Sequence, residues 1–242
     1  MKINNPSFIR ILLQLLIFLF FLQACFFTPL SVQFNAGHHI IKQKNQIGEA
    51  SQIIWVKDEG IAFFKKTKLY LIEKTGNDWI IEGQPYDAVI GRNGFALTGQ
   101  KREGDGKTPS GIYPLKMTFG YHDTVMTKMP YRQALSDDVW IDDVHTEDYN
   151  RWTKKTYTLA NSYEMMKRED NLYQYGIIIE YNTDPVVKGN GSAIFLHIWP
   201  SKGIPTAGCV AVSEENMIKI LQWLDPAKSP IIILGTNING GF

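Results

Sequence analysis

Short runs of β-branched and aromatic residues, each closed by a turn, limit the folds open to this sequence. In the first half of the chain they follow one another without a helical pattern between them, which is typical of antiparallel hairpins and argues against alternating β–α units. The sequence therefore predicts a domain that is mainly β with a few helices, an α+β fold. The expected strands cover residues 53–56, 61–64, 68–72, 78–82, 86–90, 176–180, 192–196 and 230–234.

One of the late strands leads into a histidine, a turn and a cysteine. The apolar run 193–196 places His197 at the end of a buried strand, and Gly203 and Pro205 then turn the chain. Cys209 follows in a tight Ala-Gly-Cys turn. The sequence therefore predicts a strand–turn–helix unit that brings an imidazole and a thiol together.

This unit holds what nucleophilic catalysis by a thiol requires. A thiolate that attacks a carbonyl group needs an imidazole to take its proton and backbone N–H groups to bind the oxyanion. We predict Cys209 as the nucleophile, His197 as the base, and the N–H groups of Gly208 and Cys209 as the oxyanion donors. Ser213, followed by two glutamates, predicts the N-cap of a helix whose apolar spacing continues over residues 216–224.

The N-terminus predicts a targeting segment. Lys2 and Arg10 precede an apolar run over residues 11–22, which ends at Leu-Gln-Ala-Cys25. We expect residues 1–25 to be a signal with lipidation at Cys25, and an uncleaved anchor over about 8–27 is the alternative, since about 20 residues span a bilayer. Residues 26–50 are the expected linker. Each outcome places the domain outside the cytoplasm, tethered to the membrane or released from its signal.

The chain has two cysteines, and this localisation leaves Cys209 as an unpaired thiol in a compartment that favours disulfides. Catalysis explains such a thiol, and an inert buried cysteine is the alternative.

A net charge of +1 with no basic stripe predicts no nucleic-acid partner. The glycine-rich loop 99–111 lacks the spacing and the helix of a phosphate-binding loop. We expect no metal and no cofactor.

Residues 107–114 and 90–92, together with the Thr206-Ala-Gly-Cys209 turn after His197, resemble the L,D-transpeptidase catalytic domain, also called the YkuD domain. The resemblance implies a β-sandwich with the cysteine on the strand–turn–helix unit, in a domain over residues 51–242. It also implies that residues 117–175 are an insertion. The substrate contacts implied for such a domain are Thr206, Tyr113, Arg92, Trp199, Asp142 and Asp143.

Within the insertion, Asp142 and Asp143 can form a substrate wall that faces an amine, and a solvated acidic turn is the alternative. A helix is expected around residues 162–169. Two positions depart from the family pattern, because Ala207 stands where the family has a histidine and Ala211 where it has an arginine.

The resemblance implies a periplasmic L,D-transpeptidase that acts on peptidoglycan stem peptides through a cysteine thioester. A peptidoglycan peptide hydrolase of the same fold, an L,D-carboxypeptidase or endopeptidase, is one alternative. The other is a non-catalytic wall-binding lipoprotein, since a fold does not by itself fix a function.

Overall fold

A computed structural model of the 242-residue chain describes residues 47–59 and 66–235. Its strands in chain order are β1 (Gln52–Glu59), β2 (Lys66–Thr75), β3 (Asp78–Ile81), β4 (Tyr86–Asp87), β5 (Gly111–Gly120), β6 (Tyr131–Gln133), β7 (Asp138–Ile141), β8 (Trp152–Lys154), β9 (Tyr163–Met165), β10 (Tyr175–Ile179), β11 (Phe195–Ile198), β12 (Val210–Val212) and β13 (Ile231–Leu234). The helical elements are α4 (Glu214–Trp223) and the short 3-10 helices Lys155–Tyr157 and Pro226–Lys228.

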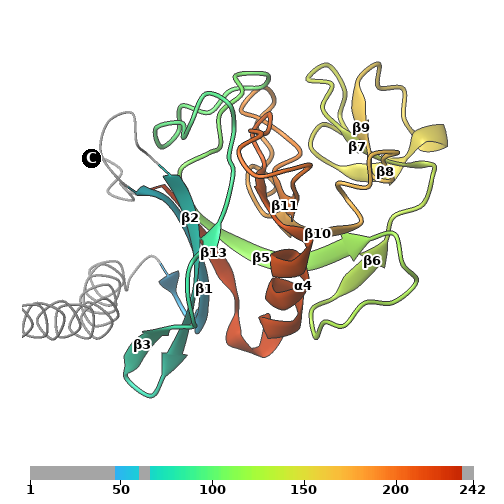
Figure 1. Ribbon diagram of the computed structural model, residues 1–242. Coiled ribbons are helices and arrows are strands. Elements are labelled where there is room, and N and C mark those ends of the chain that lie inside the picture. The colour runs from blue at the N-terminus through green and yellow to red at the C-terminus, as the bar shows by residue number, and fades with distance from the viewer. Residues whose placement is uncertain (1–46, 60–65, 236–242) are drawn as a thin grey trace, which may run out of the picture.

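Ten of the strands form one curled sheet in the order β12-β11-β10-β5-β13-β1-β2-β3, with β4 beside β2 and β6 beside β5 (Figure 1). The predicted mainly β fold with few helices is confirmed. The sheet is mixed, because β13 runs parallel to β1 and β12 runs parallel to β11.

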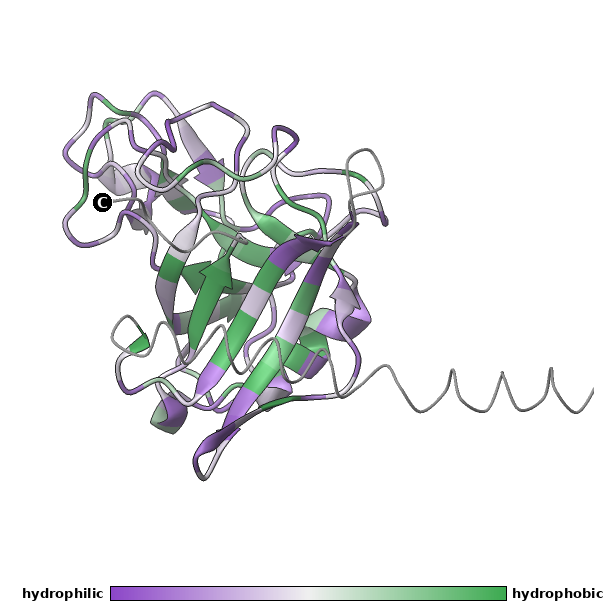
Figure 2. Cartoon of the chain, turned by 90° about the vertical axis from the view of Figure 1, so that its left-hand side faces the viewer, coloured by the Kyte–Doolittle hydropathy of each residue, from purple (hydrophilic) through white to green (hydrophobic). Residues whose placement is uncertain are grey.

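At the centre of the sheet, strands from the two ends of the described chain pair with each other. β1 pairs with β2 from Gln52–Glu73 to Glu59–Lys66, and β13 lies on its other side. All four residues of β13 are buried, which explains why its sequence is a continuous apolar run instead of an alternation. β2 is buried in its middle, over residues 69–72, and its two ends are hydrophilic and more exposed (Figure 2).

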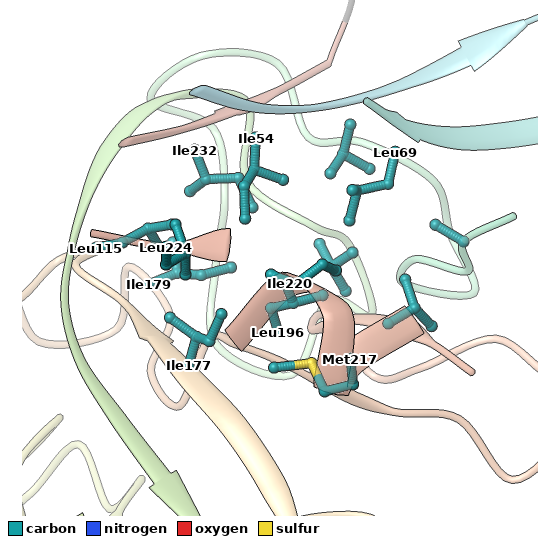
Figure 3. Close-up of a cluster of buried hydrophobic side chains, with 14 of the residues drawn as sticks. Ile54, Leu69, Leu115, Ile177, Ile179, Leu196, Met217, Ile220, Leu224 and Ile232 are labelled. Atoms are coloured by element: carbon teal, nitrogen blue, oxygen red, sulfur yellow. The ribbon is translucent and has the colours of Figure 1, made fainter. Parts of the chain in front are cut away.

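Helix α4 packs into the hollow of the sheet and closes the largest hydrophobic cluster (Figure 3). Met217, Ile220 and Leu221 are its buried face. The predicted N-cap is confirmed, because Ser213 Oγ accepts the N–H of Asn216 at 3.3 Å. This helix begins directly after β12, so the packing of α4 also fixes the strand that follows the cysteine turn.

The insertion forms a second, three-stranded sheet in the order β8-β7-β9. The helix expected around residues 162–169 is wrong, because Tyr163–Met165 is strand β9. Ile141 pairs with Tyr163 and Val139 with Met165, so pairing with a buried strand outweighs a local helical preference.

The strand expected over residues 86–90 is shorter than predicted, since β4 ends at Asp87 and Val89 makes only an isolated bridge to Ala211. The expected strand 61–64, the signal and Cys25 lie outside the described residues.

Ile47 and Ala50, at the end of the expected linker, are buried against β1 and β13. None of the helices among residues 47–59 and 66–235 is long and apolar enough to span a bilayer.

Candidate active site

Cys209 lies in a turn that two threonines hold together. Thr206 Oγ1 accepts the N–H of Gly208 at 3.1 Å and donates to the carbonyl oxygen of Cys209 at 2.6 Å. From the neighbouring loop, Thr108 Oγ1 donates to the carbonyl oxygen of Gly208 at 2.7 Å and accepts the N–H of Gly91 at 2.9 Å. The hydroxyl of Thr206, which we expected to contact substrate, therefore supports the turn.

Gly208 and Gly91 are required at this point by close approach of backbone to backbone. A Cβ on Gly208 would lie 3.1 Å from the carbonyl oxygen of Lys107, and one on Gly91 would lie 2.5 Å from that of Gly106. Any larger side chain would push the loop away from the turn. These glycines therefore fix the position of the backbone on which Cys209 stands.

The strand register places Cys209 and His197 on the same face of the sheet. Leu196 pairs with Val210 and His197 with Ala211 in the parallel β11–β12 ladder, so the cysteine lies diagonally across from the histidine. Among the described residues no hydrogen bond joins the two side chains. The register thus places the predicted pair on one face of the sheet.

The Cys209 thiol is buried, with 7% of the residue exposed. Its Sγ donates to the carbonyl oxygen of Ala193 at 3.2 Å and accepts the N–H of Phe195 at 3.4 Å. Burial raises the pKa of Cys209 to about 12, and the negative charge of Glu164 acts in the same direction. At neutral pH this group is a thiol.

His197 is held as a neutral imidazole. Burial lowers its pKa to about 4, against a usual value of 6.5. Its Nδ1 lies 2.7 Å from the carbonyl oxygen of Ile198, so this nitrogen carries the proton and donates it. The lone pair is therefore on Nε2, which is the atom that can accept the proton of a thiol.

A cleft of about 180 Å³ opens beside the cysteine turn. It brings together Gly208, Cys209 and two of the expected substrate contacts, Arg92 and Asp142. Ala207, one of the departures from the family pattern, also lines it. The remaining residues of the wall are Lys101, Glu103, Gly104, Glu164, Ser192, Ala193 and Ile194.

Three carboxylates line this cleft together with the cations Arg92 and Lys101. Glu103 accepts the hydroxyls of Tyr149 and Ser192, and Glu164 accepts that of Tyr173. Asp142 has a buried Oδ1 that finds no hydrogen-bond partner in the described part of the chain. Burial, together with the charge of Glu103, raises the pKa of Asp142. The cleft therefore presents charged groups of both signs.

Three of the expected substrate contacts lie elsewhere. The hydroxyl of Tyr113 donates to the carbonyl oxygen of Ser110 at 2.7 Å, and its ring packs edge-on against Tyr181. Asp143 accepts the backbone N–H groups of His145 and Asn161, and Trp199 follows β11 outside the cleft wall. Asp143 is buried, so it matches neither the expected substrate wall nor the solvated acidic turn.

Sequence reasoning missed a group from the insertion that surrounds the thiol. Tyr173 is 3% exposed and its ring lies 5.0 Å from that of His197, edge to face. Glu164 binds its hydroxyl, and the guanidinium of Arg168 lies 5.1 Å from its ring. Arg168 also lowers the pKa of Cys209 and of His197 through its charge. No motif marks these residues, because tertiary contacts alone bring them to the site.

The arginine that the family has in place of Ala211 would have no space in this arrangement. Ala211 is fully buried and exchanges backbone hydrogen bonds of 2.8 and 2.9 Å with Val89. The positive charge beside the catalytic pair comes instead from Arg168 in the insertion.

The curled sheet thus carries a cysteine and a histidine on one face, and a cleft opens beside the cysteine. The family model of the L,D-transpeptidase catalytic domain matches residues 58–233. This match covers most of the chain, so the chain belongs to that family.

No curated protein matches the sequence. Among solved structures, the chain is similar to the helical cell shape determining protein Pgp2 from Campylobacter jejuni at 16% identity. The TM-score is 0.39, and the match covers 76% of this chain and 47% of that protein. The chain thus spans about half the length of that protein.

Proposed function

We propose that this protein is a cysteine acyl-transfer enzyme that acts on peptidoglycan stem peptides, an L,D-transpeptidase. The observation that carries the proposal is the shared face of Cys209 and the neutral His197, whose Nδ1 faces the carbonyl oxygen of Ile198 and leaves Nε2 as the proton acceptor. The cleft beside the turn gives a peptide carbonyl group a place next to the sulfur.

The reaction begins from a neutral pair. As the sulfur attacks the carbonyl carbon of the donor peptide bond, the thiol proton moves to Nε2 of His197. The imidazolium then gives this proton to the leaving amine, and the acyl group stays on Cys209 as a thioester. An incoming amine loses a proton to His197 and resolves the thioester, which restores the thiol.

The oxyanion that forms during the attack needs a donor close to the sulfur. The N–H of Gly208 is bound to Thr206, whereas the N–H of Cys209 has no acceptor in the described part of the chain. We therefore assign the main oxyanion contact to the N–H of Cys209. The N–H of Gly208 contributes if Thr206 turns away.

The carboxylates of the cleft support an amine as the acceptor. Asp142, Glu103 and Glu164 line the cleft, and an ammonium group would pair with the unpartnered oxygen of Asp142. Water as the acceptor would make the same site a hydrolase.

The test is to incubate the purified protein with tetrapeptide-stem muropeptides and to resolve the products by mass. Crosslinked dimers support transfer. Loss of a residue or of a crosslink with addition of water, even at high acceptor concentration, means hydrolysis and overturns the transpeptidase assignment.

The burial of Cys209 favours a second candidate, a non-catalytic wall-binding domain. A thiol that is 7% exposed, with its pKa raised to about 12, also fits an inert core residue. A carbapenem, which acylates a reactive thiol, separates the two when intact mass is recorded. An adduct that Cys209→Ala abolishes supports the enzyme, and the absence of an adduct while a positive control reacts supports the binding domain.

We further propose that the domain works outside the cytoplasm, in the periplasm, and is tethered to the membrane through Cys25 or an N-terminal anchor. The support is the basic and apolar N-terminal sequence. Incorporation of labelled palmitate that Cys25→Ser abolishes tests the lipid, and recovery of the whole protein in the soluble periplasmic fraction contradicts tethering.

A further inference from the structure

Thr108 is fully buried next to the cysteine turn, and its side chain contacts that turn directly. Its backbone N–H donates to the carbonyl oxygen of Gly94 at 2.9 Å, and its own carbonyl oxygen accepts the N–H of Ala96 at 2.8 Å. Its hydroxyl accepts the N–H of Gly91 at 2.9 Å. These contacts fix Thr108 in one place and leave its hydroxyl proton to be donated to the turn.

That proton goes to the carbonyl oxygen of Gly208. The hydroxyl oxygen of Thr108 lies 2.7 Å from it, but 3.4 Å from the carbonyl oxygen of Cys209, which already accepts the hydroxyl of Thr206 at 2.6 Å. A hydroxyl has one proton to donate, so the shorter contact is the hydrogen bond. Thr108 and Thr206 therefore each hold one of the two carbonyl groups that flank the α-carbon of Cys209.

The carbonyl group of Gly208 and the N–H of Cys209 belong to the same peptide group. This peptide bond is trans, so the C=O and the N–H point in opposite directions within one rigid plane. A hydrogen bond that fixes the carbonyl oxygen therefore also fixes the direction of the N–H. Thr108 holds the oxygen from outside the cleft wall, so the N–H of Cys209 points the opposite way, away from Thr108.

We propose that Thr108 is a positioning residue for the oxyanion site: its hydroxyl fixes the Gly208–Cys209 peptide group and thereby aims the N–H of Cys209 at the oxygen of the carbonyl group under attack. The inference deepens the proposed function, because it rests on Cys209 as the nucleophile and on its N–H as the oxyanion donor. Thr108 acts through the peptide group and takes no part in the transfer of the thiol proton.

The direction of the N–H matters because an oxyanion donor lowers the barrier only if it is in place before the charge develops. Removal of one such donor slows acyl transfer roughly 10²–10³-fold. Loss of the Thr108 hydroxyl would leave the N–H present but let its peptide plane rotate. The expected effect is therefore smaller than full removal, about tenfold.

The test compares two reactions of the same thiol in the full-length protein. With p-nitrophenyl acetate, the sulfur attacks the carbonyl carbon, the carbonyl oxygen takes up negative charge, the thiol proton goes to His197, and p-nitrophenolate leaves. Methyl methanethiosulfonate transfers its methylthio group to the sulfur and releases methanesulfinate, so no carbonyl oxygen takes up charge. Both rates are read on the Cys209 peptide by mass spectrometry, because Cys25 also reacts if it carries no lipid.

Thr108→Val keeps the size of the side chain and removes the hydroxyl. We expect acetylation to slow about tenfold and methylthio transfer to stay within about twofold, because only acetylation uses the oxyanion donor. Thr108→Ser retains a hydroxyl and should keep acetylation within about threefold of the wild-type rate. An unchanged ratio of the two rates in Thr108→Val overturns the proposal, and so does a serine variant as slow in acetylation as the valine variant.

Two further variants address folding and burial. Thr118→Val is the matched control, since Thr118 is also fully buried and its hydroxyl donates to a backbone carbonyl oxygen, that of Pro130, at 3.0 Å. It should leave both rates unchanged, and a fall in their ratio as large as that of Thr108→Val overturns the proposal. If Thr108→Val does not fold by circular dichroism, Thr108→Ala removes the same donor and carries the same expectation.

Neither reagent contains peptidoglycan, so this result is distinct from that of the muropeptide assay. Turnover of muropeptides together with an unchanged ratio overturns the role of Thr108 and leaves the proposed function standing. A lowered ratio without turnover supports the role of Thr108 and contradicts the proposed function. A wild-type Cys209 that neither reagent modifies contradicts both.

Discussion

Asn150 connects the insertion to the strand that carries His197, and replacing it should destabilise the domain strongly. Its Oδ1 accepts the indole N–H of Trp140 at 2.8 Å and the N–H of Ala193 at 3.1 Å. Its Nδ2 donates to the carbonyl oxygens of Tyr181 and Asn182 at 3.1 and 2.6 Å. All four hydrogen-bonding positions of a buried amide are thus used.

Asn150→Ala leaves two buried N–H donors without an acceptor, at about 1–2 kcal/mol each. The backbone adds a second cost, because Asn150 has φ of 59°, in the left-handed region that alanine disfavours by roughly 1–2 kcal/mol. The two costs sum to about 3–6 kcal/mol of lost unfolding free energy. Asn150→Gly removes the hydrogen bonds but tolerates this φ, so it should lose about 1 kcal/mol less than alanine.

Denaturant unfolding of the three proteins gives the free energies. A loss below about 1 kcal/mol in Asn150→Ala would refute the hydrogen-bond argument. Equal losses in the alanine and glycine variants would refute the backbone part alone.

Asn150→Asp tests the direction in which stability changes with pH. Its second oxygen would face two carbonyl oxygens, so the pKa of the new carboxyl should rise above its unfolded value on folding. The folded state then binds more protons, and the variant should gain stability relative to the wild type as the pH falls. Loss of stability on acidification, relative to the wild type, contradicts the assigned contacts.

The remaining predictions concern the catalytic pair and the helix that follows it. Cys209→Ala should abolish turnover and carbapenem acylation while it leaves the fold intact by circular dichroism; more than about a tenth of residual activity contradicts a thioester mechanism. Because His197 must be neutral to act as a base and its pKa is lowered to about 4, activity should persist below pH 6.5 and fall as the pH approaches 4; an acid limb centred near 6.5 contradicts the burial of the ring. Ser213→Ala should cost about 1 kcal/mol in denaturant unfolding through loss of the cap on α4, and Ser213→Asp should restore it.

The sequence predicted those parts of the fold that depend on a few adjacent residues. The all-buried run of β13 and the N-cap at Ser213 are each visible in a few adjacent residues, and both are confirmed. β9 was missed because its partner, β7, is more than twenty residues away in the chain and supplies the buried surface that makes it a strand. A single sequence shows no sign of that pairing.

The residues of the candidate site also fall into two groups, those whose proximity follows from the sequence and those that only tertiary contacts bring together. Cys209, Gly208 and His197 lie within one strand–turn–helix unit, so their proximity follows from the spacing of the residues. Glu164 lines the cleft beside Cys209 from strand β9, which pairs with β7, and its carboxylate accepts the hydroxyl of Tyr173. Arg92 and Asp142 meet in one cleft although one precedes β5 and the other follows β7.

The charged groups around the sulfur come from the insertion and from residues 92–103, and not from the cysteine turn. Ala207 and Ala211 contribute no polar side chain, whereas Arg168, Glu164 and Asp142 all belong to residues 117–175. Keeping the catalytic pair neutral at rest avoids the cost of burying two charges. A protonated thiol also resists oxidation, since the thiolate is the species that is oxidised. In the oxidising compartment proposed for this protein, the buried neutral pair would keep the nucleophile reduced until a substrate carbonyl group reaches it.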